Sequence, residues 1–245
     1  MIIKTLIKMK MHIRYRLPLT LFLLIFIIQL TGCKKEEPIS LTDVDGNTYL
    51  AVTIGKHVWM TENLKTTKFN DNSVITNVTS NTSWSSTTKP AYSWFKNDTV
   101  YRDLYGGLYN YFAVESGKLC PVGWHVPTND EFKALEKSLG MTQAGADSLG
   151  WRGTDQGRKM KSRTGWNDNG NGTNSSGFSG LAGGYRYGAD GSFNDLGAVS
   201  YWWTSTKKST TLGLYRRLDH DQIKVYAEGV RLQAGKYVRC VRDSI

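Results

Sequence analysis

Histidine is the residue type in this sequence that most readily supports catalysis or metal binding, and three of the four histidines lie beyond residue 50. His220 stands between Asp219 and Asp221, a grouping that suits either a metal ion or a polar turn. His125 lies in a segment with prolines and a glycine, where we expect a hydrogen-bonded structural role, and the third is His57. The motifs of serine hydrolases, zinc proteases and nucleotide-binding proteins do not occur. The sequence therefore predicts no catalytic residue.

The Asn- and Gly-rich segment 167–174 is a second candidate for binding. Its asparagines at alternate positions resemble the start of a calcium-binding EF-hand loop. An EF-hand would begin with Asp and would carry a bidentate Glu where this chain has Phe178. We therefore interpret the segment as an Asx-turn loop whose side chains bond its own backbone, with bound Ca²⁺ as the alternative. No other cofactor is predicted.

Aromatic side chains are abundant, with eight Trp and thirteen Tyr in the chain. Such rings either fill a core or stack on the apolar faces of sugars, whose hydroxyls Asn and Asp can bond. Neighbouring residues on a strand point to opposite faces, so one ring of the Trp202–Trp203 pair is expected to face outward. Binding residues collect on loops, here 167–174 and 188–194. The predicted ligand-binding residues are Trp166, Asn167, Asp168, Asn171, Tyr187, Trp202 and Trp203.

Residues 1–32 have the pattern of a secretory leader. A basic stretch precedes the apolar run Leu17–Ile28, which is too short for a membrane span of about 20 residues and suits a signal peptide. Leu30-Thr-Gly-Cys33 resembles a bacterial lipobox, in which the cysteine is lipidated; a plain signal peptide with an unrelated cysteine is the alternative. Residues 33–40 would form a tether. Its Lys-Lys-Glu-Glu run resembles the export signals of Bacteroidetes-like surface lipoproteins, so we expect a lipid anchor in the outer membrane and exposure at the cell surface.

The overall charge of +10 belongs in large part to the leader. Five of the 31 basic residues precede Cys33 and none of the 21 acidic residues does, so the mature chain carries about +5. Proteins that bind nucleic acid usually carry a clustered basic face. The composition therefore argues against a nucleic-acid partner.

Two cysteines remain if Cys33 is lipidated, and both would lie in an oxidising compartment. Cys120 and Cys240 are therefore predicted to form a disulfide. Their pairing would close a loop of about 120 residues and stabilise the fold by roughly 4–5 kcal/mol on chain-entropy grounds. A metal or redox role is disfavoured because no Cys-x-x-Cys spacing exists.

The stretch Cys120–Phe132 predicts a loop that leads into a helix. Thr128 is a good N-cap, and Glu131, three residues later, completes a capping box. Gly140 would end the helix. The helix is amphipathic, so its apolar side chains should be buried and its charged ones exposed. The apolar set is Phe132, Leu135 and Leu139, and the charged set is Glu131, Lys133, Glu136 and Lys137.

Short strands and long loops are predicted around this helix. Residues 48–54 and 58–60 are predicted to form two strands joined by a turn at Gly55-Lys56. Residues 70–91 are rich in Ser, Thr and Asn and are predicted to form a long loop. No internal repeat is visible, so we expect a single domain over 41–245.

Several motifs stand in the order typical of one family. They are Asp43–Asn47, Gly55–Leu64, Tyr105–Phe112, Cys120–Thr128, Gly177–Arg186, Tyr201–Ser205 and Val238–Val241. On these motifs the chain resembles, over residues 41–243, the Fibrobacter succinogenes major paralogous domain family (FISUMP). The resemblance implies an α+β fold similar to the C-type-lectin-like and formylglycine-generating-enzyme-like folds, with short strands, long loops, one or two main helices and a single disulfide. The cysteine chemistry of the formylglycine-generating enzymes is not carried over, because both candidate cysteines are predicted to be paired.

The family is defined by sequence, so the function is inferred from context. We favour a cell-surface binding or adhesion lipoprotein whose ligand is a glycan or another surface protein. An envelope enzyme acting on polysaccharide or protein is one alternative, and a structural subunit of a surface assembly is another. A glycoside hydrolase would need two carboxylates facing each other about 5–10 Å apart.

Overall fold

Residues 39–243 are described by the computed structural model of the chain, and they belong to one compact unit, Pro38–Ile245. The predicted leader and the predicted lipidation residue Cys33 lie outside the described residues. The described part contains thirteen strands and six α-helices, so the fold is mixed and rich in β-structure.

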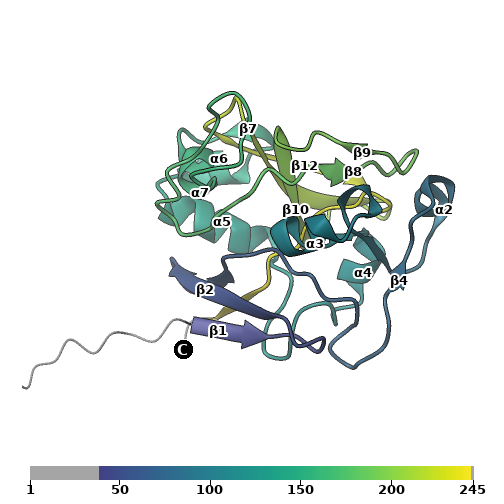
Figure 1. Cartoon of the computed structure of the whole chain (residues 1–245). Helices are drawn as coiled ribbons and strands as arrows, with labels where there is room; N and C mark the ends of the chain where they lie inside the picture. Colours follow the sequence, from purple (N-terminus) through teal and green to yellow (C-terminus); the bar gives the residue numbers. More distant parts are fainter. Residues whose placement is uncertain (1–38, 244–245) are drawn as a thin grey trace, which may run out of the picture. The chain divides into compact units, whose positions relative to one another are not determined.

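The first and last described strands belong to the same four-stranded antiparallel sheet (Figure 1). The order in this sheet is β1 (Ile39–Thr42), β2 (Thr48–Ile54), β3 (His57–Met60) and β13 (Val241–Asp243). The predicted two-residue turn joins β2 to β3, since Ile54 pairs with His57. Gly55 takes a φ of 65° in this turn, a value that glycine adopts without strain.

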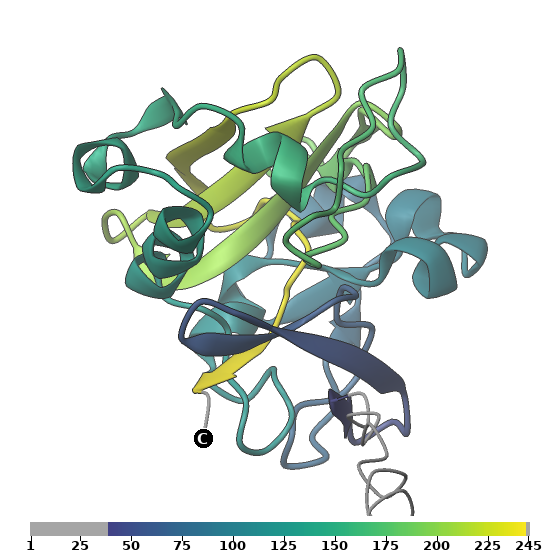
Figure 2. The same ribbon diagram turned by 90° about the vertical axis from the view of Figure 1, so that its left-hand side faces the viewer.

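A second antiparallel sheet carries the longest strands, and we call it the larger sheet and the first one the smaller sheet. Its order is β10 (Val199–Lys207), β11 (Leu212–Asp219), β12 (Val225–Arg231) and β7 (Gly150–Arg152). The C-terminal segment runs beside β10, where Tyr237 N donates to Tyr201 O, before it reaches the first sheet as β13. Figure 2 shows this yellow segment passing from the larger sheet down to the smaller one. Two minor sheets comprise β4 (Thr76–Asn77), β5 (Ala91–Ser93) and β6 (Leu108–Tyr109), and β8 (Tyr185–Arg186) with β9 (Phe193–Asn194).

The longest described helix is the one that the sequence predicts. α5 spans Asn129–Ser138, and Thr128 and Glu131 form the predicted capping box. The remaining helices are short: α2 (Asn81–Ser86), the 3₁₀ turn η2 (Phe95–Asn97), α3 (Val100–Tyr105), α4 (Tyr111–Glu115), α6 (Gln143–Asp147) and α7 (Gln156–Met160). Within residues 39–243, no helix is long and apolar enough to cross a membrane.

The larger sheet separates two hydrophobic cores. Trp203 belongs to one cluster, with Tyr201 and Tyr215, while Trp202 belongs to the other, with Phe132 and Leu218. Both tryptophans are fully buried. The prediction that one of these two rings faces outward is therefore wrong, because other elements cover the sheet on both faces. The pleat does send the two rings to opposite sides, as expected.

One charged residue of α5 is buried, contrary to the prediction. Glu136 is fully buried, and its carboxylate accepts hydrogen bonds from Arg152 and Arg216. Both arginines lie on strands of the larger sheet, over which α5 packs. The sheet supplies the counter-charges that let a glutamate occupy the inner face of the helix.

The predicted disulfide between Cys120 and Cys240 is confirmed. It joins the loop before α5 to the segment before β13. Two backbone hydrogen bonds reinforce the same junction, because His125 and Val241 each donate to the other's carbonyl at 2.9 Å. The entry to α5 and the end of the chain are thus held together by covalent and backbone bonds.

The segment 70–91 is more ordered than a long loop. It contains β4 and α2, and Ser80 caps α2 with its side chain. Trp84 anchors this helix: its ring is fully buried, and the Arg186 guanidinium lies 4.3 Å from its centroid. A single aromatic anchor with a distant partner gives no periodic signal in the sequence.

Candidate functional site

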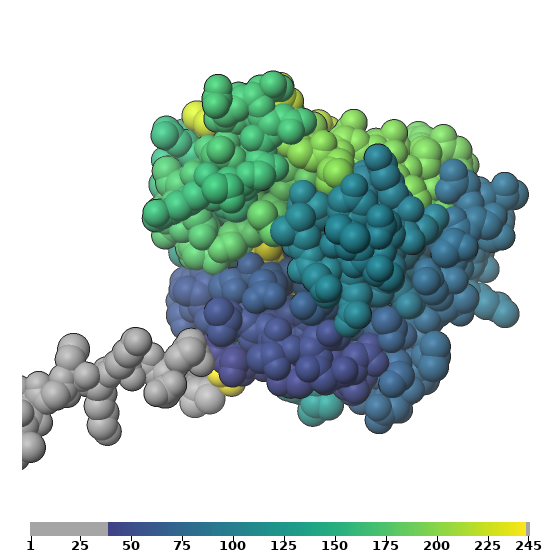
Figure 3. All heavy atoms as spheres, viewed as in Figure 1, coloured from purple at the N-terminus to yellow at the C-terminus, as the bar shows by residue number. Residues whose placement is uncertain are grey.

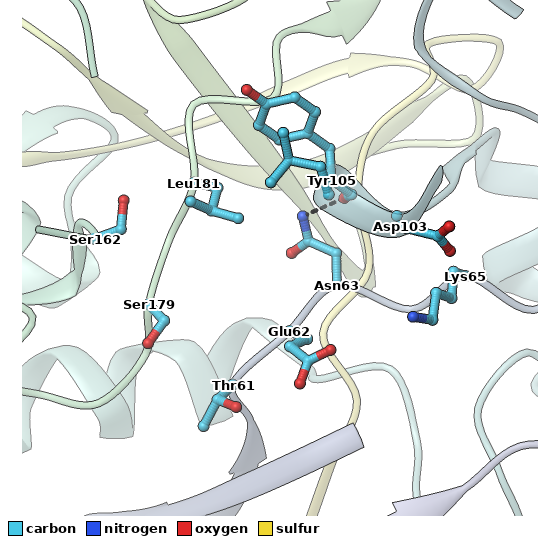
Figure 4. Close-up of a pocket in the computed structure, with 11 residues that line it drawn as sticks. Thr61, Glu62, Asn63, Lys65, Asp103, Tyr105, Ser162, Ser179 and Leu181 are labelled. Carbon is cyan, nitrogen blue, oxygen red and sulfur yellow. Dashed lines mark hydrogen bonds between the residues drawn. The ribbon is translucent and has the colours of Figure 1, made fainter. Parts of the chain in front are cut away.

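A polar groove opens where four segments of the chain meet (Figure 4). Its volume is about 240 Å³. The segment after β3 and the end of α3 form one side, and residues from 162 to 181 form the other. In Figure 3 the blue, teal and green surfaces of these segments adjoin on the face shown. The lining residues are Thr61, Glu62, Asn63, Lys65, Asp103, Leu104, Tyr105, Gly106, Ser162, Ser179 and Leu181.

Asn63 is buried at the groove and its amide is held by three hydrogen bonds. The side-chain nitrogen donates to Tyr105 O at 2.7 Å. The side-chain oxygen accepts from Trp202 Nε1 at 2.8 Å and from Arg239 Nε at 2.7 Å. These bonds fix the orientation of the amide and use both oxygen lone pairs. One N–H of Asn63 Nδ2 has no hydrogen-bond partner among residues 39–243.

Arg239 holds Asn63 in place from the side away from the groove, through the hydrogen bond to its side-chain oxygen. Its guanidinium is fully buried and donates to the carbonyls of Met60, Phe178 and Ser179. No carboxylate of the described chain forms an ion pair with it. Burial lowers the pKa of Arg239, and the charge of Glu62 acts in the opposite direction. Positive charge beneath the groove favours ligand oxygens and anionic groups.

The opposite wall is braced by side chains of the Asn-rich region. Ser179 has a φ of 53°, and Asn174 holds it by accepting from Ser179 N at 2.7 Å and donating to Ser179 Oγ at 2.8 Å. Ser162 Oγ accepts from Trp166 Nε1 at 3.0 Å. Both serine hydroxyls are thus positioned by bonds to residues behind the wall.

The comparisons with known proteins identify one family. The family model described as the Fibrobacter succinogenes major domain matches residues 52–242. The chain belongs to this family. No curated protein and no solved structure matched it. The match covers every segment that forms the groove, so the groove is part of the family domain.

Two of the predicted ligand-binding residues of this family member lie behind the groove. Trp166 is buried and bonds Ser162 and Gly180 O, while Trp202 is buried and bonds Asn63. Neither ring lines the groove. Trp203 lies in the core on the other face of the larger sheet, where its Nε1 donates to Tyr109 O at 2.8 Å. These three tryptophans are therefore supporting residues.

The remaining predicted residues lie on other parts of the surface. Asn167 and Asp168 are exposed, and Asp168 Oδ2 lies 3.3 Å from His220 Nδ1. Asn171 accepts from Trp166 N at 3.1 Å, which makes the loop partly self-bonded. Tyr187 lies between β8 and β9 and is 43% exposed. The structure does not bring these four side chains into the groove.

A second hollow, of about 220 Å³, adjoins the Asn- and Gly-rich loop 167–174, for which bound Ca²⁺ is the alternative to a self-bonded turn. Lys161 reaches it, and its ammonium donates to the carbonyls of Asp219 and Gln222 at 2.9 Å and of His220 at 3.3 Å. Burial lowers the pKa of Lys161 to about 8. The lysine takes backbone oxygens that a cation in this hollow would need. The Ca²⁺ site stays a prediction.

Sequence reasoning missed the residues that do line the groove. Asn63 stands in the quoted motif Gly55–Leu64, but nothing local distinguishes it from a surface asparagine. Its role depends on Tyr105, Trp202 and Arg239, which lie 42, 139 and 176 residues away along the chain. No periodicity or spacing rule reports a cluster assembled over such separations.

Proposed function

We propose that this protein is a lipid-anchored binding module of the outer-membrane surface whose groove takes one sugar unit of a glycan. The carrying observation is Asn63, a buried amide that three protein bonds hold in place while one N–H stays free. A donor that is fixed before binding loses little conformational entropy when it meets a hydroxyl.

The size and chemistry of the groove suit a single sugar ring. Its volume is below the range of about 300–1,000 Å³ common for larger ligands. Its lining offers an amide, two carboxylates, an ammonium and several hydroxyls for the edges of a ring. Leu181, Leu104 and Tyr105 provide apolar contact. We propose further that the domain has a C-type-lectin-like fold, an arrangement in which loops on a rigid scaffold present the ligand-binding residues.

The anchoring part of the proposal rests on the leader and the lipobox-like Cys33. Labelled palmitate should be incorporated by the wild-type chain and lost in Cys33→Ala. Incorporation that persists in the variant would contradict a lipid anchor at this cysteine.

A glycan array tests the ligand. We expect the soluble unit Pro38–Ile245 to bind a subset of glycans, and the rim variants Glu62→Gln and Asp103→Asn to lose that binding. Both side chains are exposed, so the melting temperature should stay within a few degrees of wild type. Asp168→Asn is the matched control, since it removes an exposed carboxylate from the predicted loop site. Binding that is lost in the control but kept in both rim variants would assign the ligand to that loop instead.

An envelope enzyme is the second candidate, favoured by one observation. Glu62 and Asp103 come from separate segments and both line the groove, as a hydrolytic carboxylate pair would. If this reading holds, the wild-type protein cleaves a glycan that it binds, and Glu62→Gln binds without cleaving. Chromatography of the recovered glycan distinguishes the two functions.

A further inference from the structure

A second polar cluster lies at the first sheet, among residues that do not line the groove. His57 begins β3, Asp243 lies in β13, and Glu131 belongs to the first turn of α5. One nitrogen of His57 and one oxygen from each carboxylate all lie within 4.8 Å of one another. In the described part of the chain, this is the one group of three or more His, Cys, Asp and Glu with such spacing.

The individual distances suit a small metal ion. His57 Nε2 lies 3.6 Å from Asp243 Oδ1 and 4.0 Å from Glu131 Oε1. Around Zn²⁺, ligand atoms at about 2.0–2.2 Å from the metal are roughly 3.4 Å from each other. Side-chain rotations that shorten these separations toward that value would bring the three atoms onto one ion.

The backbone already holds the three segments in place. His57 lies directly opposite Asp243 in the β3–β13 pairing. Glu131 Oε2 accepts from Thr128 N at 2.6 Å in the capping box, which leaves Oε1 directed at the histidines. His125 Nε2 contacts that same Oε1 at 2.6 Å and orients it. Rigid placement of ligands by surrounding bonds is what a metal site requires.

We propose that His57, Glu131 and Asp243 bind one divalent transition-metal ion of the zinc class, with His125 holding the Glu131 carboxylate from outside. The two carboxylates carry the charge that a divalent ion neutralises, and the imidazole supplies a nitrogen ligand. The imidazole favours Zn²⁺, Co²⁺ or Ni²⁺ over Ca²⁺ or Mg²⁺, which take oxygen ligands. Coordination positions beyond these three would be filled by water.

The affinity of this site is limited by its surroundings. His57 Nδ1 is buried and has no hydrogen-bond partner among residues 39–243. A ligating histidine normally donates its other N–H to an acceptor, which strengthens the bond to the metal. The Asp243 side chain is 86% exposed, so water competes for it. The ion would therefore exchange readily, and it would tie β13 to β3 and to the start of α5.

Titration calorimetry of Zn²⁺ into the tag-free full-length chain in detergent tests the site. We expect one ion per chain and a raised melting temperature in its presence. His57→Gln and Asp243→Asn should each weaken binding at least about tenfold, and His125→Gln should weaken it less than these two. His220→Gln removes a histidine elsewhere and should leave binding unchanged.

Two outcomes would overturn the proposal. One is the absence of a binding heat for wild-type protein with either Zn²⁺ or Co²⁺. The other is binding that survives in both His57→Gln and Asp243→Asn. Melting curves recorded without metal verify that each variant is folded, and Asp243→Asn is the safer of the two because its side chain is exposed.

Discussion

The two faces of the larger sheet both bury basic side chains, but they accommodate them differently. On the face that α5 covers, Glu136 accepts from Arg152 Nη2 at 2.5 Å and from Arg216 Nε at 2.6 Å. All three side chains are at most 1% exposed. Burial and the charge of Arg216 lower the pKa of Arg152, and Glu136 opposes that change. Two cations thus share one carboxylate.

On the other face, Lys236 is surrounded by aromatic rings. Its Nζ lies 3.7 Å from the ring centroid of Tyr201 and 4.3 Å from that of Tyr215. The rings of Tyr185 and Trp203 follow at 5.5 Å. No carboxylate of the described chain forms an ion pair with this ammonium. Burial, helped by the charge of Arg217, holds the pKa of Lys236 well below its ordinary value.

The difference follows from the chemistry of the two cations. A guanidinium keeps its charge in proteins and has five N–H donors to satisfy, so a buried arginine needs an acceptor such as Glu136. An amine can release its proton when it is desolvated, and rings attract whatever charge remains. The buried arginines on one face therefore depend on one carboxylate, whereas Lys236 on the other face depends on no single partner.

Removing the shared carboxylate should have the largest effect. Glu136→Gln leaves two buried guanidiniums without a counter-charge, and we expect the free energy of unfolding to fall by about 3–5 kcal/mol. Urea denaturation at pH 7 measures it. The control Glu115→Gln breaks an exposed pair with Lys207 and should cost less than about 1 kcal/mol. Similar losses in the two variants would show that the buried triad is not the dominant interaction.

Replacing Lys236, which aromatic rings surround, should stabilise the protein slightly. Lys236→Met keeps an unbranched chain, removes a desolvated amine and gives up cation–π contacts, so we expect unfolding at pH 7 to cost about 1–2 kcal/mol more than in wild type. Because the folded pKa of Lys236 is depressed, the unfolded chain binds the extra proton up to about pH 10. The free energy of unfolding of the wild-type protein therefore rises with pH up to about pH 10. The stability difference between Lys236→Met and wild type should narrow over the same range. A loss as large as that of Glu136→Gln would contradict the comparison.

The smallest expected effect is a loss of folding stability at alkaline pH that comes from the face with Lys236 and its tyrosines. Burial raises the pKa of Tyr201 and of Tyr215. Their stabilisation is intact below the unfolded pKa of about 10 and is lost above it, because only the unfolded chain then ionises. Tyr201→Phe should reduce the loss between pH 9 and 10.5 by about 0.8 kcal/mol.

The opposite face supplies the control for this titration. Phe178→Leu should lower stability without changing its pH dependence, because neither side chain titrates. Denaturation at several pH values measures both variants. If Tyr201→Phe loses as much stability between pH 9 and 10.5 as wild type does, ionisation of this tyrosine does not account for the pH dependence.

Local rules and simple elimination succeeded where the relevant residues are close in sequence or few in number. The capping box of Thr128 and Glu131 and the turn at Gly55 involve neighbours, and backbone geometry alone prescribes them. The Cys120–Cys240 pair followed because only two cysteines remained. The family motifs extended this success over nearly all of the described chain.

Tertiary structure alone decided which polar residues are buried and where the groove lies. Glu136 looked like a surface residue because its sequence neighbours are charged, but strands far along the chain bring Arg152 and Arg216 to it. The same holds for Asn63, whose three partners come from separate segments. Trp202 and Trp203 alternate as their strand requires, yet only the layers packed on both faces determine that neither is exposed. The sequence by itself determined the local elements and the covalent link, since these depend on short-range geometry; burial and charge compensation depend on contacts that exist only once the sheets are packed.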